Sequence, residues 1–411
     1  MNFSGMPPRT ALLLVLTGLV LTSCPPLHSL PASRTPLLYQ VQAERWPIGF
    51  NNAFSTDEHL VYFSDVAVTA FDPLEKSFTW TNEFPYAIVP EYRPDSNELY
   101  VWPKRPLGDD PFAEPLTVTV LEADSGEVLR ELSLDLPDPV LTRWQPRYVT
   151  HEGSAVYAGI DRGTIVQLQE NSDRIDFTQT IDIAEVREVS NYAEDPRAFG
   201  VIKIVPDPES DDLYALVTND VGFEGINHVY RIGASGATRW GAAPYVQPQD
   251  VLLLGGRVVY FDSVGAVLLG PASGEERQRV TIPQGECVTG PAELHPVRYD
   301  PAAHRVYAPH GALQTAPTYT WLWSVFDLVK RMDVEECTVP PASDGETAYL
   351  GGHGFLLTVG ANDGHVLSFD SRSRSGYSLR FNAPTFVIGS RVVVVYQDDW
   401  RMMMAVYQAI E

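Results

Sequence analysis

Few residues of this chain have types and spacings that suit chemistry. None of the patterns H-E-x-x-H, G-x-S-x-G, S-x-x-K or C-x-x-C occurs, so the common zinc, serine and dithiol sites are not indicated. His310 and His353 each precede a glycine and would suit a metal site only if the fold brought them together. We interpret both as turn or surface residues. The acidic run Asp207–Asp212 has a spacing that suits calcium, but it occupies the same turn position as Pro94–Asn97, so turn chemistry explains it.

Cys24 is the residue with the clearest chemical role. It follows an apolar run, Ala11–Leu21, that is too short to span a bilayer. The ending Leu21-Thr22-Ser23-Cys24 resembles the bacterial lipobox, which implies a lipid on Cys24 with more than one acyl chain, as stable anchoring requires. An ordinary secretory signal with an incidental cysteine is the alternative. We therefore predict a lipoprotein signal peptide over residues 1–23 and a tether over 24–36.

The anchor also predicts a location. The protein is expected to be exported and held in the cell envelope by its lipid. Pro25 follows the cysteine where an acidic residue would favour inner-membrane retention, so the resemblance implies the outer membrane if there are two.

Composition excludes one class of partner. The formal net charge is −24, whereas nucleic-acid binding needs a basic surface that neutralises phosphates. The 30 Gly and 33 Pro residues are scattered along the chain, which favours a fold with many turns. We therefore expect no nucleic-acid partner and an all-β protein.

The elements that must position any site are repeated strands. In Arg257–Pro283, three short apolar runs rich in Val, Ile and Tyr are separated by turns that contain Gly, Pro and Ser. This pattern is typical of an antiparallel meander. One meander cannot bury both of its faces, so it must have neighbours of its own kind.

A hydrophobic residue followed by Tyr is predicted to open the second strand of each unit, with Thr358 in the Tyr position of the seventh. The eight positions are Tyr62, Tyr100, Tyr157, Tyr214, Tyr260, Tyr307, Thr358 and Tyr396. Their mean spacing is about 48 residues, as expected for four-stranded propeller blades. The pattern predicts a single β-propeller domain over residues 37–411, with eight blades; seven blades remain the alternative.

The ends of the chain predict how the ring closes. The last unit offers three strands and then stops, so it lacks an outer strand. The segment Leu37–Trp46 precedes the first unit and has no other place. We predict that it completes the last blade and removes the open edge.

This arrangement resembles the quinoprotein-like (PQQ-like) β-propellers, and among them the propeller lipoproteins of outer-membrane barrel assembly. The lipobox and the blade pattern of residues 64–80 and 362–376 carry the resemblance. It covers almost all of the mature chain and specifies fold better than function. Quinone-dependent dehydrogenases of this family carry adjacent cysteines, which are lacking here, so we expect no cofactor.

Cys287 and Cys337 are expected in blade-to-blade connections on successive blades. Because an exported protein meets an oxidising compartment, a disulfide between them is one interpretation. It would close a loop of about 50 residues and stabilise the fold by about 4 kcal/mol. Two buried free thiols are the alternative.

Connection lengths predict a binding face. The long connections are expected on the face with the second-to-third strand and blade-to-blade loops: Pro103–Pro115, Asn219–Asn227, Pro309–Pro317, Ala184–Arg197 and Gln284–Glu293. Long loops on one face are where binding usually occurs, although tolerated insertions would look the same. The aromatic residues assigned to this face are Trp102, Phe112, Phe223, Tyr319, Trp321 and Trp400.

Two functional hypotheses follow. The first is a non-enzymatic, membrane-anchored propeller that binds an envelope protein or surface ligand, as a monomer or in a hetero-complex, and acts as an assembly scaffold. The second is an enzyme with a site in the central channel, either a metal-dependent lactonase or lyase or a quinoprotein. The channel lining discriminates them, because an enzyme needs several convergent polar side chains.

Overall fold

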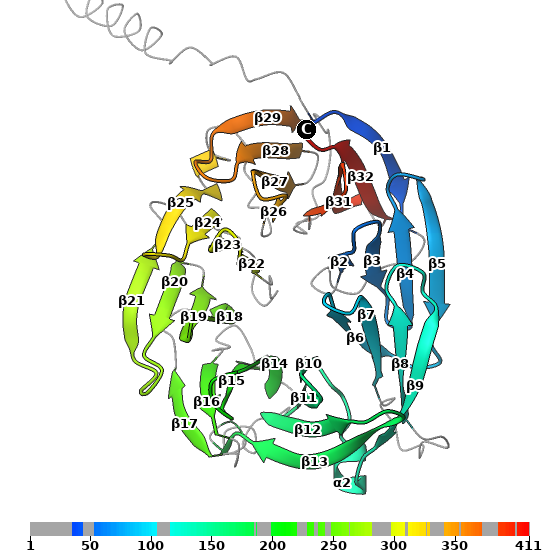
Figure 1. Ribbon diagram of the computed structural model, residues 1–411, viewed down its shortest axis with the longest axis vertical. Helices are drawn as coiled ribbons and strands as arrows, with labels where there is room; N and C mark the ends of the chain where they lie inside the picture. The colour runs from blue at the N-terminus through cyan, green and yellow to red at the C-terminus, as the bar shows by residue number, and fades with distance from the viewer. Residues whose placement is uncertain are drawn as a thin grey trace, which may run out of the picture.

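Four-stranded antiparallel units follow one another around a ring in the computed structural model (Figure 1). The structure describes residues 35–43, 53–104, 116–184, 186, 199–219, 228–233, 237–242, 248–262, 264–281, 297–308, 311–325, 327–328, 341–352, 355–371, 385–398 and 401–410. These residues form eight blades, as predicted.

In each blade the strands follow one another from the centre outward, beginning with blades 1 to 4. Blade 1 contains β2 (Phe54–Ser55), β3 (Leu60–Phe63), β4 (Ala67–Asp72) and β5 (Ser77–Glu83). Blade 2 contains β6 (Ile88–Arg93), β7 (Glu98–Pro103), β8 (Leu116–Glu122) and β9 (Val128–Asp135). Blade 3 follows the short helix α2 (Asp138–Leu141) and contains β10 (Tyr148–Glu152), β11 (Ala155–Ile160), β12 (Thr164–Glu170) and β13 (Arg174–Asp182). Blade 4 contains β14 (Phe199–Pro206), β15 (Leu213–Asn219), β16 (His228–Ile232) and β17 (Thr238–Ala242).

The remaining blades repeat this order. Blade 5 contains β18 (Pro248–Leu254), β19 (Arg257–Asp262), β20 (Gly265–Leu269) and β21 (Glu276–Thr281). Blade 6 contains β22 (Arg298–Asp300), β23 (Arg305–Ala308), β24 (Gly311–Gln314) and β25 (Thr320–Ser324). Blade 7 contains β26 (Ala342–Ser343), β27 (Thr347–Gly352), β28 (Phe355–Gly360) and β29 (Val366–Ser371). Blade 8 contains β30 (Thr385–Ile388), β31 (Arg391–Asp398), β32 (Arg401–Gln408) and, from the other end of the chain, β1 (Leu37–Gln42).

The ring is closed by its N-terminal strand. β1 pairs antiparallel with β32, with Val41 opposite Met404, and lies outermost in blade 8 (Figure 1). This confirms the predicted closure. At the perimeter β9 also pairs in parallel with β13, so blades 2 and 3 share one continuous sheet.

Hydrophobic side chains pack between blades rather than in one central core. Each of the eight apolar clusters in the described part of the chain joins two neighbouring blades. A middle strand therefore buries both of its faces, as in β19, where five consecutive residues from Val258 are buried. An outer strand such as β5 alternates between exposed and partly buried residues. This explains why the middle strands appear as continuous apolar runs.

One predicted strand position is wrong. Thr358 lies in β28, the third strand of blade 7, whereas the second strand β27 carries Ala348-Tyr349. The hydrophobic–Tyr pattern therefore persists in this blade, with the small residue Ala348 as its apolar member. Tyr349 is fully buried between blades 7 and 8, and its hydroxyl donates to Asp344 Oδ2 at 2.9 Å.

A Trp–Gly contact joins several neighbouring blades. The indole Nε1 of Trp80 donates to the Asp124 carbonyl of blade 2 at 2.8 Å, and its ring covers Gly126. Trp240 and Trp323 make the same contact with the next blade, on Pro271 and Ala361. Their rings cover Gly274 and Gly364. The outer strand of one blade is thus fixed to the turn of the next.

This contact makes Gly126 a position of large expected effect. A Cβ at Gly126 would lie 2.4 Å from Trp80 Cδ2, and the backbone φ is +68°. Gly153 has φ +61° but nothing within 4 Å of a Cβ. Gly153→Ala should therefore lower the free energy of unfolding by about 1–2 kcal/mol, the cost of a left-handed backbone at a residue with a Cβ. Gly126→Ala should lower the free energy of unfolding by about 1–3 kcal/mol more, because its Cβ would also clash with the Trp80 ring. Urea unfolding measures both, and equal losses would show that Trp80 does not constrain this turn.

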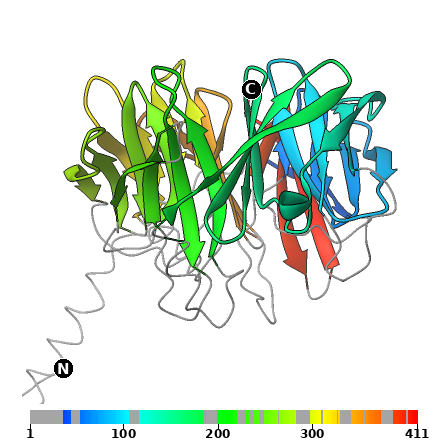
Figure 2. The same ribbon diagram turned by 90° about the horizontal axis from the view of Figure 1, so that it is seen from below.

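The strand directions define two faces (Figure 2). In each blade the turns between strands one and two and between strands three and four share one face, which we name the short-turn face. The connections from the second to the third strand and from blade to blade lie on the opposite face, which we name the loop face. β1 begins opposite Tyr407 near the end of β32, so the described chain starts on the short-turn face. No helix among the described residues is long and apolar enough to cross a bilayer.

Candidate functional site

Trp102, one of the six aromatics predicted to form the binding face, is interior. It is fully buried between blades 2 and 3, and its Nε1 donates to Glu91 Oε2 at 3.2 Å. Because neighbouring blades cover both faces of a second strand, the end of β7 lies in the core rather than on the surface. The predicted exposure of Trp102 is therefore wrong.

Tyr319 and Trp321 are also misplaced by the sequence prediction. The supposed long connection Pro309–Pro317 contains strand β24, so the two aromatics fall at and after the turn between the third and fourth strands. Tyr319 is buried against blade 5. Trp321 Nε1 donates to the Val280 carbonyl of blade 5 at 2.9 Å. Both residues pack blade 6 on blade 5, and neither belongs to the loop face.

The other predicted site residues lie outside the described residues: Phe112, Phe223, Trp400, Cys24, Cys287, Cys337, His310 and His353. Their assigned roles remain predictions.

The acidic run Asp207–Asp212 forms a turn, as interpreted from sequence. Asp207 accepts hydrogen bonds from the Glu209 amide and the Ser210 hydroxyl. Asp212 accepts from Arg231 Nε at 2.7 Å, which supplies a positive charge at this turn. No group of three or more metal-binding side chains gathers among the described residues.

An ionic network that the sequence did not predict lies between blades 2 and 3. His151 on β10 is enclosed by two carboxylates, with Nδ1 2.8 Å from Glu91 Oε1 and Nε2 3.1 Å from Glu170 Oε2. Its side chain is only 2% exposed. Nδ1 is hydrogen-bonded to Glu91, and Nε2 lies within ion-pair distance of Glu170, so the charges around the ring favour an imidazolium.

The network continues outward through Tyr100 and Arg130. The Tyr100 hydroxyl donates to Glu170 Oε1 at 3.0 Å and accepts from Arg130 at 2.6 Å. Arg130 also lies 2.6 Å from Glu98. Charges of opposite sign therefore alternate from the inner strands toward the perimeter.

Burial and pairing set the pKa values of this network. Burial alone would lower the pKa of His151, but hydrogen bonds and charges from Glu170 and Glu91 outweigh it and raise the pKa. Burial would raise the pKa of Glu170, but contacts with His151, Tyr100 and Arg130 lower it. The His151 ring has almost no solvent contact, so we assign the network to holding two blades together rather than to catalysis.

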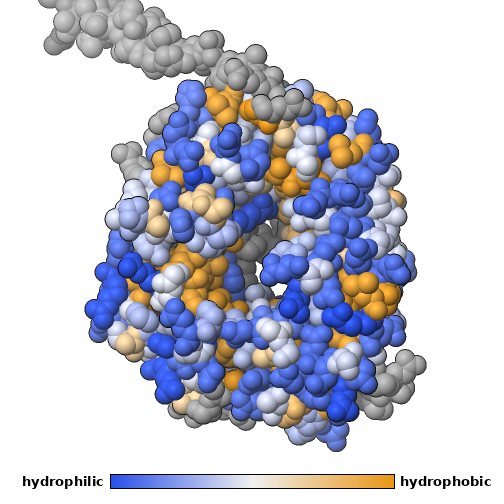
Figure 3. All heavy atoms as spheres, in the orientation of Figure 1, coloured by the Kyte–Doolittle hydropathy of each residue, from blue (hydrophilic) through white to orange (hydrophobic). Residues whose placement is uncertain are grey.

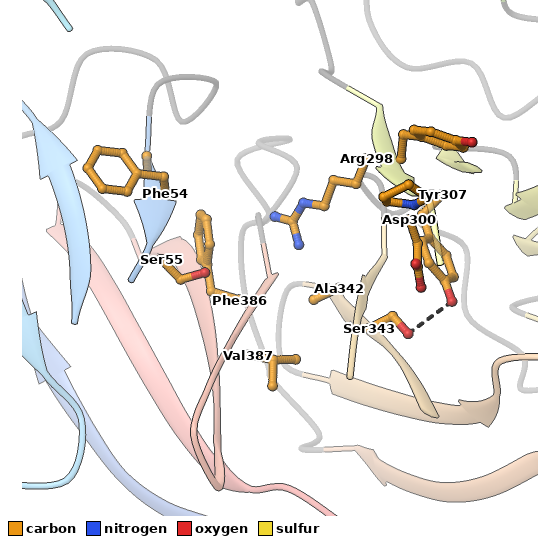
Figure 4. A pocket seen from close by; sticks show the side chains of 12 residues that line it. Phe54, Ser55, Arg298, Asp300, Tyr307, Ala342, Ser343, Phe386 and Val387 are labelled. Carbon is orange, nitrogen blue, oxygen red and sulfur yellow. Dashed lines mark hydrogen bonds between the residues drawn. The ribbon is translucent and has the colours of Figure 1, made fainter. Parts of the chain in front are cut away.

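A cavity lies in the central channel. The inner strands β2, β22, β26 and β30 of four blades line a pocket of about 510 Å³. Figure 3 shows the opening at the centre of the ring, with hydrophilic residues on most of its rim. The close-up in Figure 4 shows apolar and polar side chains facing each other across this pocket. The size suits a small organic ligand.

Arg298 is the cation in this pocket. Its side chain extends from β22 across the space, and its guanidinium lies 5.1 Å from the centre of the Phe386 ring on β30 (Figure 4). Burial lowers the pKa of Arg298 to about 10, which leaves it charged at neutral pH. Among the described residues it makes no hydrogen bond or ion pair.

The neighbouring polar groups are mostly engaged elsewhere. Asp300 Oδ1 accepts from the Ala303 amide at 3.0 Å. The Ser343 hydroxyl accepts from Tyr307 at 2.9 Å and donates to the Thr347 carbonyl at 2.8 Å. The hydroxyl of Ser55, on β2, has no hydrogen-bond partner among the described residues. The pocket therefore presents the Arg298 cation, the Asp300 carboxylate and the Ser55 hydroxyl beside aromatic rings.

Comparisons with known proteins support the fold. No protein-family model matches the chain, and no curated protein matches it by sequence. A europium-containing methanol dehydrogenase has a TM-score of 0.54 at 12% identity, with 92% of this chain and 93% of that chain covered. The quinohemoprotein alcohol dehydrogenase ADHIIG from Pseudomonas putida HK5 has a TM-score of 0.51 at 11% identity, with 92% and 76% covered. BamB from Moraxella catarrhalis gives 0.48 at 11% identity, with 91% and 97% covered. The first two likenesses show a shared propeller fold and, at this identity, nothing of activity.

Proposed function

We propose that this protein is an exported, lipid-anchored propeller that binds another component of the cell envelope and serves as a scaffold in assembly. The lipobox at Cys24 and the closed eight-bladed ring support this proposal. A rigid ring whose loops vary independently of its core is a platform for binding.

The main observation behind this proposal is the place where the described chain enters the ring. Leu37 pairs with Tyr407 at the short-turn face, and just before it the Thr35 hydroxyl lies 3.1 Å from that of Ser368 on β29. The 11 residues back to Cys24 reach at most about 40 Å. The described chain therefore enters the ring on the face opposite the long connections, which supports an anchor on the short-turn side and a partner on the loop face.

The alternative is an enzyme with its site in the channel. It predicts several convergent groups able to hold a metal or transfer a proton. In the described lining of the pocket Asp300 is the one carboxylate, and a single acid without a second acid or base beside it favours binding over catalysis. Metal analysis of the purified protein discriminates the two, and a stoichiometric metal would favour the enzyme.

The loop face can be tested by capture from cross-linked envelopes. We expect the parent to recover one defined envelope component, and a variant with Phe112, Phe223 and Trp400 changed to Ala to recover at least about tenfold less, since aromatic anchors dominate interfaces. The matched control changes Leu74 and Val128, each 49% exposed and located at short turns, to Ala and should recover as much as the parent.

Circular dichroism and the unfolding midpoint must first show that both variants are folded. Equal recovery by the loop variant and the parent would remove the loop face as the docking surface. A loss in the Leu74 and Val128 variant alone would assign docking to the short-turn face instead.

A further inference from the structure

The Arg298 guanidinium in the channel pocket makes no ion pair with any described residue. Arg298 is partly buried and lies over the Phe386 ring, and the described residues offer it no carboxylate within ion-pair distance. Asp300, two residues away on the same strand, lines the same pocket and accepts from the Ala303 amide through Oδ1, but it makes no ion pair with Arg298. An isolated cation removed from water is costly unless an anion accompanies it.

We propose that this pocket binds a small organic anion whose carboxylate or phosphate group is held by Arg298. A guanidinium presents two parallel donors that match either group. The Ser55 hydroxyl, which lines the same pocket, adds a donor from blade 1. This site is separate from the proposed docking on the loop face.

The rest of the ligand is apolar or aromatic. Phe54 and Phe386 line the pocket from β2 and β30, and Figure 4 shows both rings on the side of the pocket toward which Arg298 extends. Phe54 is held in place by stacking on Tyr92, with ring centroids 3.9 Å apart. A volume of about 510 Å³ accommodates more than an inorganic ion. The pocket therefore selects a molecule with an anionic head and an apolar body.

Titration calorimetry with four probes tests the site. Benzoate and phenyl phosphate carry the two anionic heads on one aromatic body, benzyl alcohol lacks the charge, and acetate lacks the ring. We expect saturable binding of at least one aromatic anion, at least about tenfold weaker binding of acetate, and none of benzyl alcohol. The tighter of benzoate and phenyl phosphate assigns the head as carboxylate or phosphate.

The variant Arg298→Gln should reduce that binding by at least about tenfold, as expected for a charge-assisted hydrogen bond. It should unfold at the same urea concentration as the parent or a higher one, because the charge makes no ion pair with any described residue. Arg277→Gln is the control for net charge, since that side chain is 64% exposed, and should bind as the parent does.

Failure of both aromatic anions to bind the parent, or equal binding by Arg298→Gln, would overturn the proposal. A clear loss of stability in Arg298→Gln would instead make Arg298 a structural residue. None of these results depends on the envelope capture, so the two proposals stand or fall separately.

Discussion

Replacement of Val41 by proline should open the ring and lower the free energy of unfolding by about 2–5 kcal/mol. Val41 lies opposite Met404 in the pair of β1 and β32. The Ala43 amide, two residues on, donates to the Met402 carbonyl at 2.8 Å. Because amides alternate along an antiparallel strand, that of Val41 also points at β32. Proline removes this donor and places its ring against the partner strand.

Gln42→Pro is the matched control. Gln42 lies opposite Met403, and by the same alternation its amide points away from β32 toward the open side of the outermost strand. Proline is tolerated at such edge positions, so the loss should stay below about 1 kcal/mol.

Loss of β1 also exposes a new edge. The unpaired β32 of the Val41→Pro variant offers a template for another chain, so we expect dimers or larger species by light scattering. Equal stability of the two proline variants, with both monomeric, would show that β1 contributes little to closing the ring.

The repeat and its closure could be predicted from sequence because they depend on counting. Strand runs and turn residues recur with each blade. The last unit lacks an outer strand, and Leu37–Trp46 is the one segment left over to supply it. The outer-strand tryptophans Trp80 and Trp240 can also be recognised in the sequence, but their contact with the turn of the next blade cannot. Trp323 holds the same position in blade 6, and this match also places the neighbouring Trp321 in the outer strand rather than in a loop.

The buried polar groups could not be predicted because no local pattern marks them. Glu91 and His151 are 60 residues apart and meet only because neighbouring blades face each other. Arg298 stands at the start of a three-residue inner strand, where single-strand patterns carry little information. The inner strands decide the channel chemistry, and the four that line the pocket, β2, β22, β26 and β30, are the shortest strands of their blades.

Removal of the buried imidazolium should have the other large effect. His151→Leu leaves Glu91 and Glu170 facing each other without the cation between them. Breaking a buried ion pair by removing one partner costs about 3–5 kcal/mol, and we expect a loss of this size near pH 6. The exposed His365 provides the control, because His365→Leu should change stability by less than about 0.5 kcal/mol.

The pH dependence identifies the charge as the cause. The pKa of His151 is raised above its ordinary value of 6.5, so its contribution is fully present below pH 6.5 and is lost as the pH rises through the folded-state pKa. The contributions of Glu170 and Glu98, whose pKa values are lowered from 4.5, act in the opposite sense and fade as the pH falls below that value. Urea unfolding from pH 5.5 to 9 should therefore show the parent losing stability relative to His151→Leu as the pH rises. A constant difference over this range would mean that His151 is neutral in the folded protein and that its charge does not help to join the two blades.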